Sequence, residues 1–254
     1  MKVGLVVALV MRGLCAGSAI ACIQAAAADV LVLAPNAAKE SIAEAVAIFE
    51  KSSGHTVIVS WTGTEAITKR ITEGETVDIV VNAAQNIDRL TTDGKLSPGS
   101  RTDFAKSLIG IAVAPSVPRP DVSTIEGLKS TLLAAKSIVI SSGTSGRYLS
   151  DLFDRLEVGE QIKVKVKQPP SGVQIGELLA SGEAELGFQQ VSELIHVSGI
   201  QFLGPLPAEL QRYTIYSGAA HIQAPQPEAA RAFLKVLRQP EVAAAVKKSG
   251  MEPL

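Results

Sequence analysis

Cysteine is almost absent from this chain of 254 residues, and both cysteines, Cys15 and Cys22, lie near the N-terminus. Residues 29–254 contain none, so that part of the chain can form neither a disulfide nor a thiolate metal site. The three histidines are dispersed and form no recognisable metal-ligand set. We therefore expect neither a bound metal nor a cofactor.

Aromatic residues and excess charge are also scarce. Aromatics make up 4% of the chain, Trp61 is the one tryptophan, and the formal net charge is −1. A weakly charged chain gives no electrostatic footprint for nucleic acid or an anionic membrane, and few aromatics argue against stacking on bases or sugars. We expect a small polar ligand and no nucleic-acid partner.

The first 28 residues have the pattern of a secretory signal peptide. Lys2 and Arg12 flank an apolar run at 3–10, and a row of alanines at 25–28 gives a small-residue cleavage site. A membrane anchor is the alternative, but Arg12 interrupts the run and no later segment reaches the ~20 apolar residues of a span. We expect a signal peptide at 1–28 and a free, monomeric protein in the periplasm.

From residue 29 the hydrophobic pattern alternates between strand and helix. Strands are expected at 30–34, 56–61 and 78–81, each followed by a polar or small turn and a helix. This alternation predicts an α/β fold with mostly parallel sheets and helices on both faces. Ligands bind beyond the carboxyl ends of such strands, so the turns are candidate binding positions. The first two turns contribute Asn36, Thr62, Gly63 and Thr64.

The middle of the chain reads as a second lobe. Residues 98–107 look like a connector, 108–114 like an apolar strand that enters the second lobe, and 162–166 like a half-exposed strand. The order of the expected strands and helices predicts that residues 29–106 and 214–254 form lobe 1 and that residues 107–213 form lobe 2.

A Ser/Gly-rich loop follows the apolar run at 137–140 and opens a helical pattern. Unpaired N–H groups at a helix start and the positive end of its dipole favour an anion. Hydroxyls add donors, glycine allows close approach, and an arginine offers a guanidinium fork to a carboxylate. An ordinary N-cap with a solvated arginine remains the alternative. The candidate residues are Ser142, Thr144, Ser145, Gly146 and Arg147.

Two later segments add candidates. Residues 169–172 lead into a predicted helix at 173–180, which places Ser171 and Val173 at another helix start. A short buried strand is expected at 186–190, where Gln189 could offer amide groups to a ligand.

The order and spacing of several motifs resemble the type II periplasmic solute-binding fold, and in particular the molybdate-binding protein family. The motifs are Thr62-Gly63-Thr64, Gly146-Arg147-Tyr148, the Gly182–Gly187 segment and the Pro227–Leu234 segment. The resemblance implies two lobes that close over a ligand in a central cleft, and an inner-membrane permease of an ABC-type transporter as partner.

The binding positions depart from the family pattern, in which the first turn carries serines and the strand after the Gly-Glu-Ala segment carries a tyrosine. Here the first turn has Asn36, and that strand offers Gln189. A tetrahedral oxyanion needs only neutral donors, whereas Arg147 and amides suit a planar carboxylate. The sequence therefore predicts capture of a small anion, either a carboxylate or an oxyanion.

An enzyme is the alternative, because a bacterial aconitate isomerase is similar to the same branch of solute-binding proteins. Interconversion of cis- and trans-aconitate needs an anion cradle and an acid/base group. Glu65, beside the second turn, and His221, after the expected strand at 213–219, are the candidates. Glu65 could instead only stabilise a helix N-terminus, and His221 could be a surface histidine.

Overall fold

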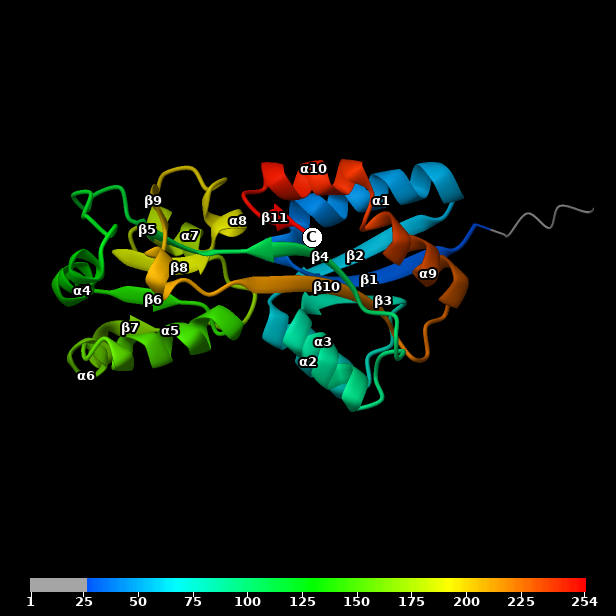
Figure 1. Cartoon of the computed structure of the whole chain (residues 1–254), viewed down its shortest axis with the longest axis horizontal. Helices are drawn as coiled ribbons and strands as arrows, with labels where there is room; N and C mark the ends of the chain where they lie inside the picture. Colours follow the sequence, from blue (N-terminus) through cyan, green and yellow to red (C-terminus); the bar gives the residue numbers. More distant parts are fainter. Residues whose placement is uncertain (1–26) are drawn as a thin grey trace, which may run out of the picture.

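Two separate β-sheets organise the chain (Figure 1). The computed structural model describes residues 27–254, so nearly all of the predicted signal peptide lies outside the described residues. The first sheet has the strand order β11-β4-β10-β3-β1-β2. Its strands are β1 (Asp29–Pro35), β2 (Thr56–Thr62), β3 (Ile79–Ala83), β4 (Thr102–Ser107), β10 (Thr214–Ala220) and β11 (Glu252–Pro253).

The second sheet has the order β7-β6-β8-β5-β9 and is built entirely from the middle of the chain. Its strands are β5 (Ile109–Val113), β6 (Ile138–Ile140), β7 (Val166–Lys167), β8 (Leu186–Gln190) and β9 (Gln201–Pro205). We call each sheet with its covering helices a lobe.

Helices cover both faces of each sheet, as predicted. The first lobe has α1 (Lys39–Ser53), α2 (Thr64–Thr72), α3 (Ala84–Thr92), α9 (Pro227–Val236) and α10 (Pro240–Lys248). The second has α4 (Ile125–Ala134), α5 (Thr144–Arg155), α6 (Gly159–Ile162), α7 (Ile175–Ala180) and α8 (Val191–Leu194). Short 3-10 turns are η1 (Asn36–Ala38), η2 (Lys163–Lys165) and η3 (Ala208–Leu210). Figure 1 shows α1 and α10 on one side of the first sheet and α2 and α3 on the other.

The sheets are mixed, which corrects the prediction of mostly parallel sheets. Strand β1 pairs in parallel with β2 and β3, and β6 pairs in parallel with β7 and β8. The strands that connect the lobes run the other way: β10 is antiparallel to β3 and β4, and β5 is antiparallel to β8 and β9. The chain must leave and re-enter each sheet at the cleft edge, and this reversal produces the antiparallel pairs.

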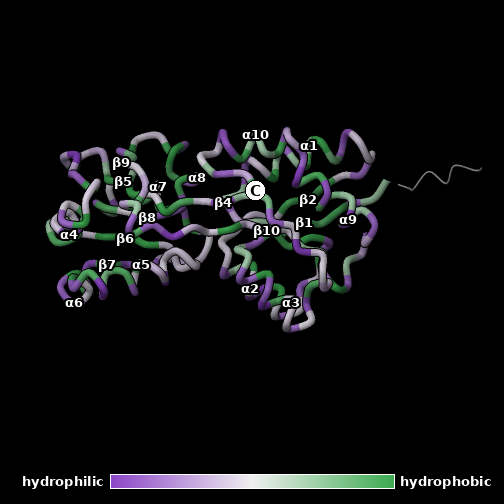
Figure 2. Tube along the Cα trace, in the orientation of Figure 1, coloured by the Kyte–Doolittle hydropathy of each residue, from purple (hydrophilic) through white to green (hydrophobic). Residues whose placement is uncertain are grey.

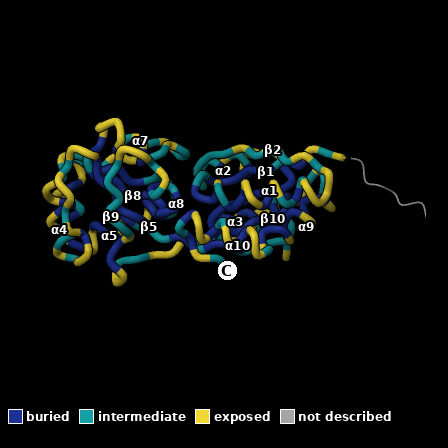
Figure 3. Tube along the Cα trace, turned by 90° about the horizontal axis from the view of Figure 1, so that it is seen from above, coloured by how far each residue is buried: buried dark blue, intermediate teal, exposed yellow. Residues whose placement is uncertain are grey.

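Each lobe has hydrophobic cores on both faces of its sheet. In the first lobe, Phe49 and Phe233 pack together on the face covered by α1, α9 and α10, and Ile67 of α2 and Ile87 of α3 are buried in the core of the other face. Figure 2 shows apolar segments alternating with polar ones along the chain, and Figure 3 shows buried backbone through the interior of both lobes. Burial of these apolar faces is the main force that holds each lobe together.

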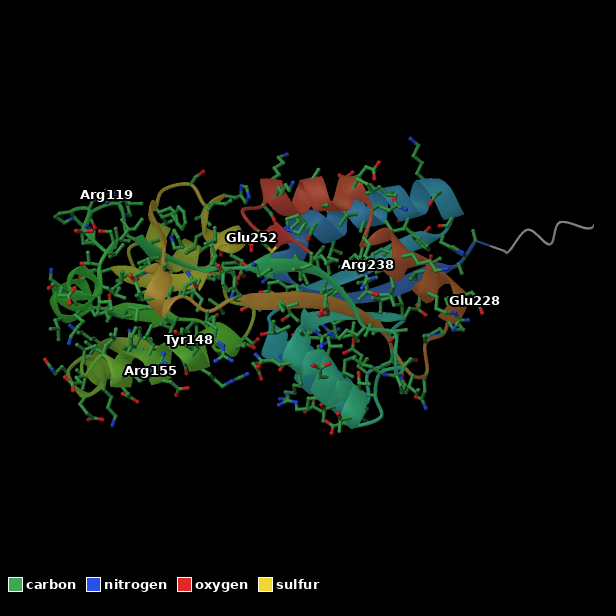
Figure 4. The ribbon with its side chains drawn as sticks, viewed as in Figure 1. Arg119, Tyr148, Arg155, Glu228, Arg238 and Glu252 are labelled. Carbon is green, nitrogen blue, oxygen red and sulfur yellow. The ribbon has the colours of Figure 1, made fainter. Side chains whose placement is uncertain are left out.

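Two segments join the lobes at the cleft. The chain passes from β4 to β5 at Leu108, and returns from β9 to β10 through η3. The Tyr148 hydroxyl of α5 donates a hydrogen bond of 2.7 Å to the carbonyl of Leu210, which ties the returning segment to the second lobe. Figure 4 shows Tyr148 and Arg155 along α5. The guanidinium carbon of Arg155 lies 5.3 Å from the centre of the Tyr148 ring.

Two local predictions were wrong. Part of the expected connector at 98–107 is strand β4, which pairs with β10 on one side and β11 on the other. The expected strand at 162–166 is mostly helical, from α6 into η2. There the Lys165 ammonium donates to the carbonyls of Leu133 and Ala135 at the end of α4, so a side chain that looked solvated caps a helix.

Candidate functional site

A cavity lies between the lobes and encloses about 530 Å³ of space, part of it open to solvent. Its walls come from the ends of strands β1, β2 and β6, from the loop before α7, and from β10 and α8. The sequence-predicted residues that line it are Asn36, Thr62, Gly63, Thr64, Ser142, Thr144, Ser145, Ser171 and Val173. Turns that are far apart in the sequence therefore meet at one place.

Two helix N-termini, one from each lobe, reach this cavity. Helix α2 begins after Gly63 and α5 begins after Gly143, and both glycines line the wall. Neither helix has a side-chain N-cap hydrogen bond. Backbone N–H groups of the two first turns, apart from that of Ala66, which donates to Ser171 Oγ, and the positive ends of two helix dipoles are therefore available to an anion.

Hydroxyl groups surround these helix starts. Thr144 Oγ1 is buried without a hydrogen-bond partner, which is a costly arrangement unless a ligand supplies one. The Asn82 amide positions the other helix start by donating to the carbonyl of Thr64 and to Thr68 Oγ1, both at 3.1 Å. Asn82 is fully buried and was not among the predicted residues.

The lobes touch each other along one side of the cavity. The backbone N–H of Ala66 donates to Ser171 Oγ at 3.1 Å, and Asn36 Nδ2 donates to the carbonyl of Gly172 at 3.2 Å. A Cβ atom on Gly63 would lie 2.3 Å from Ser171 Oγ, so only glycine permits this approach. The structure therefore describes the two lobes in a closed arrangement.

The far wall of the cavity carries an acid that the sequence reasoning missed. Glu193, on α8, lines the cavity together with Gln190, Thr214 and Tyr216. Burial raises the pKa of Glu193 to about 7, and hydrogen bonds, including one of 2.9 Å from Gln189 Nε2, oppose the shift. Burial, assisted by the nearby Glu193, raises the pKa of Tyr216 well above its usual value. Glu193 is therefore the group in the wall that can gain or lose a proton near neutral pH.

Three predicted binding residues lie outside the cavity wall. Arg147 Nη1 forms an ion pair of 3.0 Å with Glu65 Oε1 across the lobes. Gly146 is buried behind the wall, where a Cβ atom would collide with the carbonyl of Ser141. Gln189 is buried too, and its amide accepts from the Ile175 N–H at 3.0 Å while it donates to Glu193. Gln189 is placed to orient Glu193 rather than to contact a ligand.

The two predicted acid/base candidates also lie outside the wall. Glu65 stands at the start of α2 and faces Arg147 at the interlobe surface. His221 follows β10, whose Tyr216 pairs with Ala83 at the cavity end of β3 while its Ala220 pairs with Ile79 at the other end. This register places His221 at the opposite edge of the sheet, and the proposed acid/base role of His221 in the cleft is therefore corrected. Burial lowers its pKa, and Lys95 adds to that shift.

Residues 27–254 contain no cluster of His, Cys, Asp and Glu side chains that could hold a metal ion. They also contain no helix long and apolar enough to cross a membrane.

Two α/β lobes around a cleft lined by hydrogen-bond donors define a solute-binding protein. A sequence model of the bacterial extracellular solute-binding protein family matches residues 30–252, and the chain belongs to that family.

Named relatives fall into two functional groups. The aconitate isomerase of a Pseudomonas species is 35% identical over 229 residues, which cover 88% of this chain and 87% of the relative. The molybdate-binding protein ModA of Rhodobacter capsulatus is 25% identical, with 89% of each chain covered. The periplasmic molybdate-binding protein of Azotobacter vinelandii has a similar structure, with a TM-score of 0.74, 19% identity, and coverage of 87% of this chain and 98% of that one. That last likeness establishes the fold alone.

Proposed function

We propose that this protein captures a small anion, a carboxylate or an oxyanion, between its lobes. The observation that carries the proposal is the convergence of two helix N-termini and a set of hydroxyl groups from both lobes on one cavity. Such a cradle compensates negative charge with N–H dipoles and neutral donors, as anion sites at helix starts do.

The side chains of the wall favour an organic anion over a simple oxyanion. Thr144 and Ser142 supply donors from the start of α5 and the loop before it, while Glu193 and Gln190 supply polar groups from α8 and the end of β8. A tetrahedral oxyanion that is fully ionised would meet the carboxylate of Glu193, whereas a carboxylic acid with further polar groups could use both sets of residues.

Calorimetric titration of the purified protein with trans-aconitate, citrate, molybdate, tungstate and sulfate tests the proposal. We expect heat with at least one of the carboxylates and a matching rise in thermal stability, because a ligand that binds only the folded state stabilises it. No heat and no thermal shift with any of the five would overturn the proposal.

The cellular role proposed for this capture is export to the periplasm and delivery of the anion to an ABC-type permease. The family match and the signal-peptide pattern of residues 1–28 support it. Fractionation of cells that produce the full chain, with N-terminal sequencing of the mature protein, tests the export. A full-length protein retained in the cytoplasm would contradict it.

Aconitate isomerase activity is the second candidate function, and Glu193 is the observation that favours it. The 35% identical relative carries that name, and Glu193 is an acid in the cavity with a pKa of about 7. In the reaction, the methylene carbon loses a proton, the double bond shifts to that carbon, and the former vinylic carbon gains a proton. One carboxyl group that exists in both states near neutral pH can serve both steps: ionised, it removes the proton, and protonated, after exchange with solvent, it delivers a proton to the other carbon.

Absorbance assays with cis- and trans-aconitate test the activity. We expect interconversion by the wild type and incorporation of deuterium from heavy water into the product. Glu193→Gln should lose at least a hundredfold in kcat, the scale of a lost general acid/base group, while Glu65→Gln retains most of the rate. No turnover by folded wild type that binds aconitate would leave the protein as a binding protein only.

A further inference from the structure

The cavity contains a carboxylate but no cation to balance it. Among the described residues, the lining includes no Lys, Arg or His, and Glu193 is its one acid. Arg147, the arginine nearest in sequence to the cradle, is paired with Glu65 outside the wall. An anion that enters this cavity therefore adds a second negative charge without a side-chain counter-ion.

Hydrogen bonds position Glu193 in the wall. Its carboxylate accepts from Gln189, whose other amide atom is fixed by the backbone of Ile175. The neighbouring Gln190 amide nitrogen donates to Thr214 Oγ1 at 3.1 Å. The amide oxygen of the same buried side chain has no hydrogen-bond partner.

The charged groups on the surrounding elements do not neutralise Glu193. On α8 and its flank, His196 pairs with Glu40 of the first lobe at 3.0 Å. Near η1, Lys39 is exposed, and Glu177 on the neighbouring α7 is exposed as well. From β10 the titratable group that faces Glu193 is Tyr216, which stays a neutral donor.

We propose that the cleft binds its anion together with one proton, which Glu193 carries in the complex. The inference rests on the proposed anion binding and deepens it, and it concerns Glu193 as a binding residue, because a carboxyl that stays protonated in the complex cannot act as the base of an isomerase. Two like charges held close together in a partly buried cleft repel more strongly than they do in water, and protonation of the carboxyl removes the repulsion and supplies a donor in place of an acceptor. The favoured ligands are therefore anions with an acceptor group at the Glu193 end.

The linkage has a defined direction. Glu193 titrates at about 7 in the free protein. Below that pH the carboxyl is already protonated, so anion binding takes up few protons from solution. Above it, each further pH unit should weaken the binding by about tenfold, because one proton must be taken from solution for every anion bound.

Calorimetry with trans-aconitate tests the coupling, once the protons that the probe's own carboxyl groups carry at each pH have been measured by titration of the probe alone and subtracted. For the wild type we expect binding at about pH 8 to be roughly fivefold weaker than at about pH 7, where about half of the carboxyl groups are already protonated. The heat at about pH 8 should also vary with the ionisation enthalpy of the buffer in proportion to one proton, and at about pH 6 it should not. Equal affinity at both pH values and buffer-independent heat would overturn the proposal.

Glu193→Gln is the informative variant, because glutamine imitates the protonated carboxyl in size and in its ability to donate. We expect its affinity to be constant with pH and to exceed that of the wild type at about pH 8 by roughly tenfold. Glu177→Gln, a change of the same kind at an exposed site, should keep the wild-type slope. If Glu193→Gln does not fold, the buffer dependence of the wild type still decides. Absence of binding at every pH would instead contradict the anion-binding function itself.

Discussion

Single side chains in the cleft either face the ligand space or hold a neighbour in position. Thr144 and Gln190 carry buried polar atoms without partners and belong to the first group. The amide groups of Asn82 and Gln189 form hydrogen bonds with other residues, so these two side chains belong to the second group. Glu193 links the two groups, because Gln189 orients it toward the cavity.

Replacement of Thr144 by valine should separate binding from stability. Valine has nearly the same shape but no hydroxyl, so we expect anion affinity to fall about tenfold, the scale of one hydrogen bond to a charged group. The free energy of unfolding should stay within about 0.5 kcal/mol or rise, because the lost hydroxyl has no partner. Titration calorimetry and urea unfolding measure the two effects.

The matched control is Thr91→Val, on α3, where the hydroxyl donates to the Ile87 carbonyl within its own helix. It should leave the affinity unchanged. Equal affinity of the Thr144 variant and wild type would mean that this hydroxyl faces no ligand.

Glu193 should lower the stability of the unliganded protein at neutral pH. A carboxyl whose pKa rises from 4.5 to about 7 on folding stabilises the folded state while it is protonated. This stabilisation is complete below pH 4.5 and is lost as the pH rises through about 7. Glu193→Gln should therefore raise the free energy of unfolding by about 3 kcal/mol at about pH 8 and by nearly nothing at about pH 4. Unfolding curves at the two pH values measure this difference. A constant difference would show that Glu193 does not titrate with folding.

At this scale the sequence predicted donors better than acids. Hydroxyl and glycine residues in the turns after strands are recognisable because strand ends meet at one edge, and Thr64, Ser142 and Ser171 do line the cavity. Glu193 sits on a one-turn helix after a buried strand, and nothing in the local pattern shows that this turn faces the cleft. The closure of the second lobe against η1 decides that, and it is a property of tertiary packing.

The elements that form the cleft are strand ends followed directly by helix starts, and this local signal is readable from sequence. Strand β8 (Leu186–Gln190) has the bounds predicted for it, 186–190. Strand β4 was hidden because its sequence, Thr102–Ser107, is polar enough to resemble a connector. Its two neighbouring strands come from the C-terminal part of the chain, and such distant pairing leaves no local trace.

The absence of a side chain at Gly63 should matter for ligand affinity because it lets the two lobes come together. Its backbone conformation should matter little. Its φ of −90° suits any residue, but an added Cβ would lie 2.3 Å from Ser171 Oγ and 2.6 Å from the Gly172 nitrogen. Gly63→Ala should therefore keep the free energy of unfolding within about 1 kcal/mol. Its affinity should fall more than tenfold, because closure over the ligand is blocked.

Gly94→Ala is the control for Gly63→Ala, and the two changes should have opposite profiles. Gly94 has φ of 69° and open space around its missing Cβ, so alanine there costs about 1 kcal/mol of stability and leaves affinity unchanged. Small-angle scattering adds a direct measure of shape: ligand should compact the wild type and fail to compact the Gly63 variant. If Gly63→Ala keeps the wild-type affinity, then the close approach of Gly63 to Ser171 is not needed for anion binding.

At the scale of the whole molecule, the two lobes meet through the cleft walls and through ion pairs at their rims. Glu65 of the first lobe pairs with Arg147 of the second, and Glu40 of the first pairs with His196 of the second. Their charges lie at the surface, where ion pairs contribute little energy and act mainly on orientation. The sequence indicated two lobes from the alternation of elements, but only the assembled structure shows which side chains meet across them.

Arg147 is a test of what closes the molecule. Its side chain is 53% exposed and that of Glu65 is 27% exposed, so the pair should contribute at most about 1 kcal/mol. We expect Arg147→Met to weaken anion binding by less than about fivefold, and to have almost no further effect in a Glu65→Gln background. The effect should also shrink at high salt, which screens exposed charges. Arg155→Met, in the same helix and exposed beside Tyr148, is the control and should change nothing. A loss above about a hundredfold that persists without Glu65 would instead mean that Arg147 turns into the cleft and binds the anion itself, because a direct guanidinium contact to a carboxylate is worth far more than an exposed pair at the rim.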